Sequence, residues 1–286
     1  MSGKHHLLGL LAAALLTACE RPAVVDPGTA PVSAVDSTAA RPFTFGETRT
    51  LHSAILGQDR TINVALPPGF SPDSSTRYPV IYLLDGSADE DFVHIAGLVQ
   101  FMATYALMPP SIVVGIGNVD RGHDLTYPTR NDSDKVWVPN SGGSADFLRF
   151  IAGELLPFVD AHYRTNARRT LVGQSLGGLL ATQALIERPE LFDTWIMVSP
   201  SLWWDDGSLG GRAAAWAQLH GGDAETVFIA MANNDDMMRG PVAKLVAALK
   251  TTHPPFRWAY EDFPYETHAS ILHRAAYRAF EWEGVE

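Results

Sequence analysis

The chain has 286 residues, of which 46% are hydrophobic and 19% are charged, and its formal net charge at pH 7 is -11. These proportions are typical of a globular protein with a sizeable core. An acidic surface repels nucleic acid and anionic lipid headgroups, so we expect no nucleic acid partner and no basic membrane-binding patch. The chain contains 1 cysteine, which excludes an internal disulfide.

Residues 1–18 have the layout of a bacterial secretory signal. Lys4 precedes an apolar run, residues 7–16, that is too short to span a membrane comfortably. The run ends in Leu-Thr-Ala-Cys, the pattern that precedes a lipid-modified cysteine. We therefore expect Cys19 to carry a lipid that anchors the protein in the bacterial cell envelope, at the outer membrane or the periplasmic face of the inner membrane. The alternative is an ordinary signal peptide with an incidental cysteine.

Residues 19–43 are rich in Pro, Ala, Val, Ser, Thr and Asp and lack helical or strand periodicity. This composition predicts a flexible tether between the lipid and a folded domain. The domain itself is predicted to extend over residues 44–286.

Within this domain, predicted strands alternate with predicted helices. Residues 48–55 and 60–66 alternate in polarity around a turn at 57–59, which predicts two antiparallel edge strands. Short apolar runs typical of buried parallel strands follow at 78–84, 111–117, 170–172, 195–198, 226–231 and 256–260. Helical patterns lie between them at 91–108, 144–162, 179–185, 212–219, 241–251 and 271–282. The alternation predicts a doubly wound, mostly parallel sheet with an antiparallel N-terminal edge.

The polar stretch at 120–143 is too long for a simple connection, and we expect it to form a loop over a functional site. In doubly wound sheets such sites lie at the carboxyl ends of the strands.

A Gly-x-Ser-x-Gly motif, Gly173 to Gly177, lies between a predicted strand and a predicted helix. A sharp turn there exposes the hydroxyl of the central serine and directs the helix N-terminus toward it. Ser175 is therefore the predicted nucleophile. Without this strand–turn–helix context, the motif would indicate only a structural turn.

A serine nucleophile needs a histidine base, and the histidine needs a group that fixes its tautomer. His268 lies in the loop between the last predicted strand and the last predicted helix, where the base belongs. The acid should follow the strand at 226–231, where Asp235 is the first choice and Asp236 the alternative. One aspartate of the pair is expected to cap the next helix instead.

Catalysis at Ser175 would also need an oxyanion hole with two backbone N–H donors. We expect one from Leu176, directly after the serine. The second should come from the loop after the strand at 78–84, where Gly86 and Ser87 are the candidates.

Five blocks of sequence together resemble the Putative esterase family of α/β-hydrolases, a family that includes siderophore esterases, S-formylglutathione hydrolase-like enzymes, feruloyl esterases and mycolyltransferases. The blocks are Tyr-Leu-Leu-Asp-Gly at 82–86, Asp-Arg at 120–121 with Asp-Leu-Thr at 124–126, Gly-Gln-Ser-Leu-Gly-Gly at 173–178, Ser-Pro-Ser-Leu-Trp-Trp at 199–204, and His-Ala-Ser at 268–270. The resemblance covers most of residues 45–282 and implies an α/β-hydrolase fold with Ser175 and His268 as the catalytic pair. Many relatives have Gly and an acidic residue where this chain has Asn-Asn-Asp-Asp, so the resemblance leaves open both the acid and a Ser–His dyad.

The expected activity is a serine esterase that hydrolyses a small, carbohydrate or siderophore-type carboxylic ester through an acyl-enzyme. The alternatives are acyl transfer to another acceptor and an inactive ligand-binding lipoprotein on the same fold. No cofactor is expected, and the residues around Arg121 lack the spacing of a metal site. We expect the substrate-binding residues to include Trp203, Trp204, Asp205 and Arg121, with core packing as the alternative role of the two tryptophans. The sequence carries no signal for an oligomeric state.

Overall fold

The structure of the protein is a computed structural model that describes residues 40, 43–219 and 226–284, so the predicted signal and Cys19 lie outside the described residues. Residues 44–286 form one compact unit. Within the described ranges, no helix combines the length and the apolar character needed to cross a bilayer.

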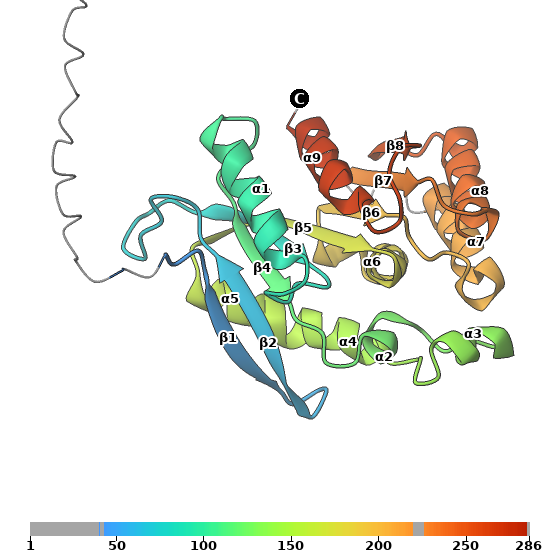
Figure 1. Cartoon of the computed structure of the whole chain (residues 1–286), viewed down its shortest axis with the longest axis horizontal. Helices are drawn as coiled ribbons and strands as arrows, with labels where there is room; N and C mark the ends of the chain where they lie inside the picture. The colour runs from blue at the N-terminus through green and yellow to red at the C-terminus, as the bar shows by residue number, and fades with distance from the viewer. Residues whose placement is uncertain (1–39, 41–42, 220–225, 285–286) are drawn as a thin grey trace, which may run out of the picture. The chain divides into compact units, whose positions relative to one another are not determined.

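Eight strands form one sheet in the order β1-β2-β4-β3-β5-β6-β7-β8 (Figure 1). The hairpin of β1 and β2 is antiparallel, and β2 pairs with β4 antiparallel as well, whereas the pairings from β4 through β3 to β8 are parallel. The predicted mostly parallel sheet with an antiparallel N-terminal edge is therefore confirmed. The strands are Glu47–Ser53, Gln58–Ala65, Tyr78–Leu83, Ile112–Ile116, Thr165–Gln174, Thr194–Val198, Thr226–Ala232 and Arg257–Phe263, from β1 to β8.

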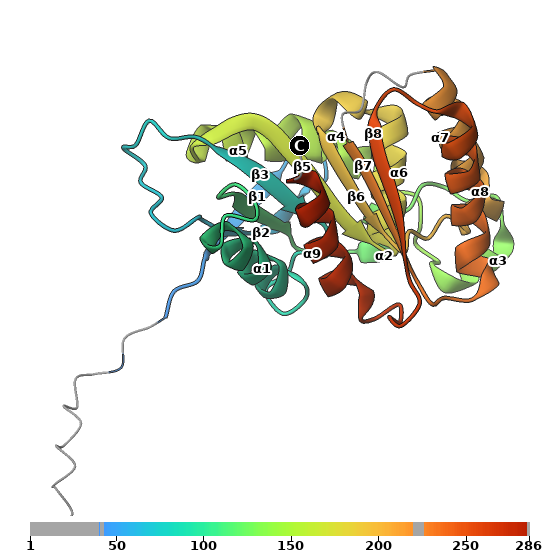
Figure 2. The ribbon, with the colours of Figure 1, turned by 90° about the horizontal axis from the view of Figure 1, so that it is seen from above.

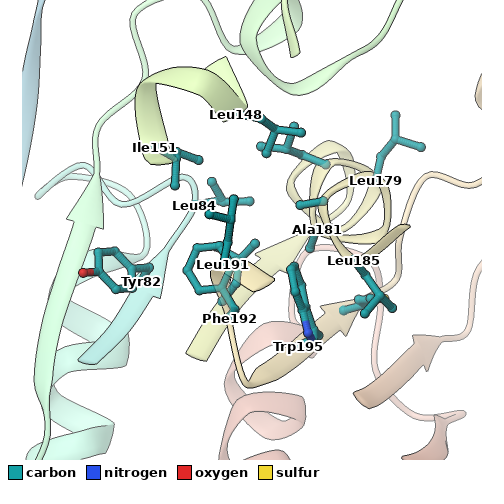
Figure 3. Close-up of a cluster of buried hydrophobic side chains, with 14 of the residues drawn as sticks. Tyr82, Leu84, Leu148, Ile151, Leu179, Ala181, Leu185, Leu191, Phe192 and Trp195 are labelled. Atoms are coloured by element: carbon teal, nitrogen blue, oxygen red, sulfur yellow. The ribbon is translucent and has the colours of Figure 1, made fainter. Parts of the chain in front are cut away.

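Helices cover both faces of the sheet because its central strands are apolar on both sides (Figure 2). One face packs against α1 (Phe92–Thr104) and α9 (Ile271–Glu283). The other face carries the larger core, which includes side chains from α4 (Ser144–Phe150), α6 (Leu176–Glu187), α7 (Trp204–Leu219) and α8 (Asp236–Thr252). Figure 3 shows part of this core, where Leu84, directly after β3, and Trp195 of β6 lie in one cluster with Leu148 and Leu179 from the helices.

The predicted helix at 144–162 has a π-helical turn, η1 (Ile151–Leu155), between α4 and α5 (Leu156–His162). This turn carries Glu154, whose carboxylate accepts hydrogen bonds from Ser53 Oγ and from the backbone N–H groups of Ala54 and Ile55. The turn between β1 and β2 is thereby fixed to the helical layer. A short 3-10 helix, η2 (Pro189–Leu191), precedes β6.

Several elements differ from the sequence prediction: β5 begins at Thr165 rather than at residue 170, and α7 begins at Trp204 rather than at residue 212. The stretch at 120–143 is not simply a loop, because it contains the short helices α2 (Arg121–Leu125) and α3 (Asp132–Trp137). Asp120 and Asn131 start these helices by accepting hydrogen bonds from the backbone N–H groups of His123 and Ser133. In addition, α8 begins at Asp236 rather than at Pro241, which lies inside the helix.

A buried ion pair attaches this insertion, residues 120–143, to the sheet. Arg60 on β2 donates from Nη1 to Asp124 of α2 at 2.7 Å, and the two side chains are 0% and 2% exposed. The guanidinium also donates to the carbonyl of Gly117 at 3.2 Å and lies 5.0 Å from the ring centroid of Phe147. Since α2 begins at Arg121, this pair also sets the position of that residue.

We predict that Arg60→Ala lowers the free energy of unfolding by about 3–5 kcal/mol, because it leaves the Asp124 carboxylate buried without its partner. Urea unfolding followed by circular dichroism would measure the loss. Arg149→Ala is the matched control, since it removes an exposed pair whose side chains are 60% and 56% exposed, and it should leave the transition unchanged. Equal transitions for wild type and Arg60→Ala would contradict the prediction.

Candidate active site

Ser175 occupies a strained turn between β5 and α6. Its φ of 59° and ψ of -119° lie in a region that side chains rarely adopt. Three backbone hydrogen bonds hold it there: Ser175 N–H donates to Val198 at 3.0 Å, while its carbonyl accepts from Leu179 and Ser201, each at 3.0 Å. Ser175 directly follows the last residue of β5, so it lies at the carboxyl end of that strand, and it is half-buried.

The turn requires glycine on both sides of the serine because backbones approach closely there. A Cβ on Gly173 would lie 2.4 Å from the carbonyl oxygen of Gly177, and a Cβ on Gly178 would lie 2.9 Å from the Cα of Pro200. Neither obstacle is a movable side chain, so a larger residue would open the turn. The spacing of the motif is thus a consequence of packing between β5, α6 and the end of β6.

His268 lies in the loop after β8, and this loop is bonded to the residue next to Ser175. Gln174 donates from its side-chain amide to the carbonyl oxygen of His268. A second contact comes from the backbone N–H of Asn233, which donates to Glu266 at 2.9 Å. These bonds bring together the segments that carry the predicted nucleophile and base, which lie far apart in the sequence, at the carboxyl end of the sheet.

The group that contacts the His268 ring is Asn234, not Asp235. The amide nitrogen of Asn234 lies 3.1 Å from Nδ1 of His268. Asp235 is the N-cap of α8, where its carboxylate accepts from the backbone N–H of Met238 at 3.1 Å. Asp236 is the first residue of that helix, and both aspartates are exposed. Sequence reasoning missed Asn234 because it searched for an acid, although asparagine fills this role beside histidine in some hydrolases.

Two of the three oxyanion candidates are placed with available N–H groups. Leu176 is the first residue of α6, where intrahelical bonding leaves the N–H groups free. Gly86 does not fit the role, because its N–H donates to the carbonyl of Ile116 at 3.0 Å. Among the described residues, the backbone N–H of half-buried Ser87 has no backbone acceptor, so Ser87 is the better second donor.

The hydroxyl of Ser175 has a neighbour that the sequence did not reveal. Ser201 Oγ lies 3.4 Å from Ser175 Oγ, and Ser201 is 2% exposed. Its position follows from the bond between its own N–H and the carbonyl of Ser175. The Ser-Pro-Ser segment after β6 therefore forms part of the wall around the candidate nucleophile.

Arg121 lies near the same edge and forms a two-pronged ion pair with Asp85. Its Nε and Nη2 donate to the two carboxylate oxygens at 2.7 and 2.8 Å, while Asn118 donates to one of them at 2.7 Å. This leaves Nη1 without an acceptor among the described residues, on a side chain that is 37% exposed. The free Nη1 of Arg121 could therefore donate a hydrogen bond to an anionic ligand.

Two of the predicted substrate-binding residues, Trp204 and Asp205, are buried and do not line a binding surface. Trp204 is 0% exposed, and its indole N–H donates to the carbonyl of Tyr127 at 2.9 Å, so it cannot contact a ligand. Asp205 is also buried and accepts from the backbone N–H of Arg130 at 2.7 Å. Both residues fix the insertion to the start of α7. Half-buried Trp203, packed edge-on against Trp204, keeps some exposed surface.

The surroundings of His268 favour its neutral form. Burial lowers the pKa of His268 below the ordinary value, the positive charge of Arg121 lowers it further, and Asp235 opposes both effects. The pKa of Asp91, a carboxyl whose charge interacts with Arg121, shifts upward instead. Burial and the charges of Asp85 and Glu90 raise it to about 6. A neutral imidazole is the form that can accept a proton from a serine.

No group of three or more metal-ligating side chains occurs in the described part of the chain. His123, two residues after Arg121, forms a hydrogen bond through Nδ1 with the carbonyl of Asn140 at 2.8 Å.

The sequence pattern of the Putative esterase family matches residues 53–281. The chain belongs to this family, and its sheet order and strained serine turn are those of an α/β-hydrolase.

Two curated relatives are named as esterases. Ferri-bacillibactin esterase BesA of Bacillus subtilis is 31% identical over 178 residues, which cover 57% of this chain and 61% of the relative. Siderophore triacetylfusarinine C esterase of Aspergillus fumigatus is 33% identical over 176 residues, covering 57% of this chain and 58% of the relative. The aligned part thus spans about three fifths of these relatives.

Solved structures share the fold. An IroE-like serine hydrolase from Shewanella oneidensis has a TM-score of 0.76 and 30% identity, covering 83% of this chain and 79% of that one. The siderophore hydrolase EstB of Aspergillus nidulans has a TM-score of 0.70 at 24% identity, with 86% and 96% covered, and supports the fold alone.

We predict that Arg121→Gln raises the pKa of His268. The substitution removes a positive charge near the ring and leaves the Asp85 carboxylate unneutralised, and both changes favour the imidazolium. An NMR titration of the His268 ring protons would measure the shift. Arg130→Gln serves as the control, because the side chain of Arg130 is 92% exposed and should not affect the titration. A pKa that stays constant or falls in Arg121→Gln would contradict this assignment.

Proposed function

We propose that this protein is a serine esterase that cleaves carboxylic esters through a covalent acyl-enzyme. The observation that carries the proposal is the strained turn at Ser175 together with the bond from Gln174 to the His268 loop. A partly exposed serine on such a turn, with a histidine on the adjoining loop whose surroundings favour the neutral form, is the arrangement used for nucleophilic attack on carbonyl carbon. The curated relatives named as esterases support the same activity.

In the first half of the reaction, Ser175 Oγ forms a bond to the ester carbonyl carbon and transfers its proton to Nε2 of His268. The carbonyl oxygen becomes an oxyanion, which accepts hydrogen bonds from the N–H groups of Leu176 and Ser87. The carbon–oxygen bond to the leaving alcohol then breaks, and His268 returns the proton to that alcohol. The acyl group stays on Ser175.

In the second half, a water molecule loses a proton to His268 and attacks the acyl carbon. The second tetrahedral intermediate collapses by breaking the bond to Ser175 Oγ, which recovers the proton from His268. The products are the carboxylic acid and the free enzyme. Hydrolysis rather than acyl transfer requires only that water reach the acyl-enzyme before another alcohol does.

We further propose a siderophore-type ester as the substrate. Support comes from the names of the two curated relatives and from Arg121, a cationic side chain close enough to His268 to lower its pKa. An iron-loaded tricatecholate ester is anionic, and a guanidinium N–H is a suitable donor to such a ligand. Trp203 offers an aromatic face with partial exposure.

We predict that Ser175→Ala reduces the kcat for p-nitrophenyl acetate by about 10³-fold or more, because the nucleophile is lost while the fold is kept. The wild type should also form a fluorophosphonate adduct on the peptide that contains Ser175, detected by mass spectrometry. Ser75→Ala, at an exposed serine, is the control and should retain full activity. An active, unlabelled Ser175→Ala protein alongside an unlabelled wild type would overturn the serine mechanism.

The same assay, run on a panel of esters, tests the substrate class. The kcat/KM for a tricatechol trilactone should exceed the values for a feruloyl sugar and for p-nitrophenyl acetate. A higher value for the feruloyl sugar would assign the site to carbohydrate esters instead.

We also propose that Cys19 is lipidated and that the protein is a lipoprotein of the bacterial cell envelope, as the residues before Cys19 indicate. Expressed as the full chain in a bacterium, the protein should incorporate an alkyne-labelled fatty acid and sediment with membranes. Cys19→Ser should lose both properties while the esterase activity per molecule stays constant. Labelling that persists in Cys19→Ser, or an unmodified Cys19 in the mature wild type, would contradict the anchor.

A further inference from the structure

In the turn after β7, the described side chain that contacts the ring of His268 is that of Asn234. The chain reverses sharply there, since the backbone N–H of Asn234 donates to the carbonyl of Ala232 at 2.8 Å. This reversal directs half-buried Asn234 toward His268, with its amide 3.1 Å from Nδ1, and leaves Asp235 and Asp236 exposed. The bond from Asn233 to Glu266 attaches the same turn to the loop that carries His268.

A buried serine supports the other end of the Asn234 side chain. Ser199 Oγ lies 3.3 Å from the side-chain oxygen of Asn234 and accepts from the backbone N–H of Ala232 at 3.0 Å. Ser199 is 0% exposed and has a φ of 40°, so its position is fixed by the end of β6. The amide of Asn234 is therefore held between a rigid hydroxyl and the imidazole.

We propose that Asn234 is the positioning residue of His268, in the place that an aspartate or glutamate occupies in a Ser–His–acid triad. This inference rests on the proposed esterase function of Ser175 and His268. The third member of the catalytic site, beside Ser175 and His268, is then a neutral amide, and Asp235 caps helix α8.

The proposed role fixes how the amide must be oriented. His268 can accept the serine proton only if Nε2 carries no hydrogen, and its hydrogen must then be on Nδ1. Asn234 accepts that hydrogen when its amide is turned over, so that the oxygen rather than the nitrogen faces Nδ1. A half-turn of the amide exchanges its oxygen and nitrogen within the same space. The nitrogen then donates to Ser199 Oγ, which has lone pairs to accept it.

A neutral partner has a consequence for pH dependence. The charged groups that act on His268 are Arg121 from α2, which disfavours the imidazolium, and Asp235 at the start of α8, which favours it. Among the residues that the structure describes, no carboxylate is bonded to Nδ1 to stabilise the imidazolium further. The base therefore stays unprotonated, and the enzyme stays active, at a lower pH than it would with an aspartate at position 234.

The test compares Asn234→Asp, Asn234→Ala and Asp235→Asn with the wild type. In Asn234→Asp the new carboxylate should raise the pKa of His268, moving the acidic limb of the kcat/KM profile up by about one pH unit or more. In Asn234→Ala the kcat should fall by roughly 10-fold or more with little change in KM, because the ring loses its tautomer control. Asp235→Asn is the matched control, since asparagine also caps helices. Its kcat/KM on the pH plateau should stay within about twofold of wild type, and its acidic limb should move down, opposite to Asn234→Asp, because a charge that favours the imidazolium is lost.

A second readout does not depend on turnover. The ¹⁵N spectrum of the His268 ring, identified by its loss in His268→Asn, should show the hydrogen on Nδ1 in the wild type and a mixture of tautomers in Asn234→Ala. This measurement separates the inference from the proposed function, whose failure would appear as an active Ser175→Ala protein.

Two outcomes would overturn the positioning role. One is an Asp235→Asn variant that loses activity as expected for Asn234→Ala while both Asn234 variants match the wild type, which would make Asp235 the acid. The other is unchanged profiles and an unchanged ring tautomer in both Asn234 variants, with full activity in Asp235→Asn, which would make the site a Ser–His dyad.

Discussion

The close backbone approach around Ser175 determines the arrangement of the rest of the site. A Cβ on Gly173 would come within 2.4 Å of the Gly177 carbonyl oxygen, so strand β5 and helix α6 touch there without any intervening side chain. The serine between them adopts a strained conformation, which costs on the order of 1–3 kcal/mol. Bonds from β6 and from Ser201 compensate for this strain, and the same bonds position the Ser-Pro-Ser wall.

The histidine is held in a different way, by side chains rather than by a strained backbone. Gln174 binds the carbonyl of His268, and Asn234 contacts its ring. The segment that carries His268 is a loop between β8 and α9, where no helical or strand ladder fixes the main chain. The position of the His268 ring therefore depends on the side-chain amides of Gln174 and Asn234, which lie at the end of β5 and just after β7.

Much of the fold follows from the sequence because its signals are local. The apolar runs at 78–84 and 226–231 have the composition of doubly buried strands, and both are strands close to these bounds. Helices α2 and α3 escaped prediction because they have 5 and 6 residues and lie in a stretch rich in Gly, Pro, Asn and Asp. Their formation depends on the side chains of Asp120 and Asn131 as caps, and on the burial of Asp124 against Arg60.

The chemistry of the site was predictable only where one residue type was available at the right place. Ser175 and His268 could be chosen from topology, and the structure brings their segments together. The Asn-Asn-Asp-Asp run offers four side chains that could partner the histidine, and the tight turn at Asn234, not the sequence, decides which one faces the ring. The burial of Trp204 likewise depends on Tyr127, which is far away in sequence.

The insertion between β4 and α4 is divided into two parts with different freedom to evolve. Its inner part, including Tyr127 and Thr129, is bonded to Trp204 and Asp205 at the start of α7, so a substitution there would disturb the core. Its outer part ends in Val136 and Trp137, whose side chains are 79% and 77% exposed and unconstrained by packing. Buried Asp134 of α3 belongs with the constrained part, because it accepts from the backbone N–H of Asp205 at 2.7 Å. Divergence in this lineage should therefore accumulate on the exposed face of α3, where new surface chemistry can be acquired without disturbing the contacts beneath.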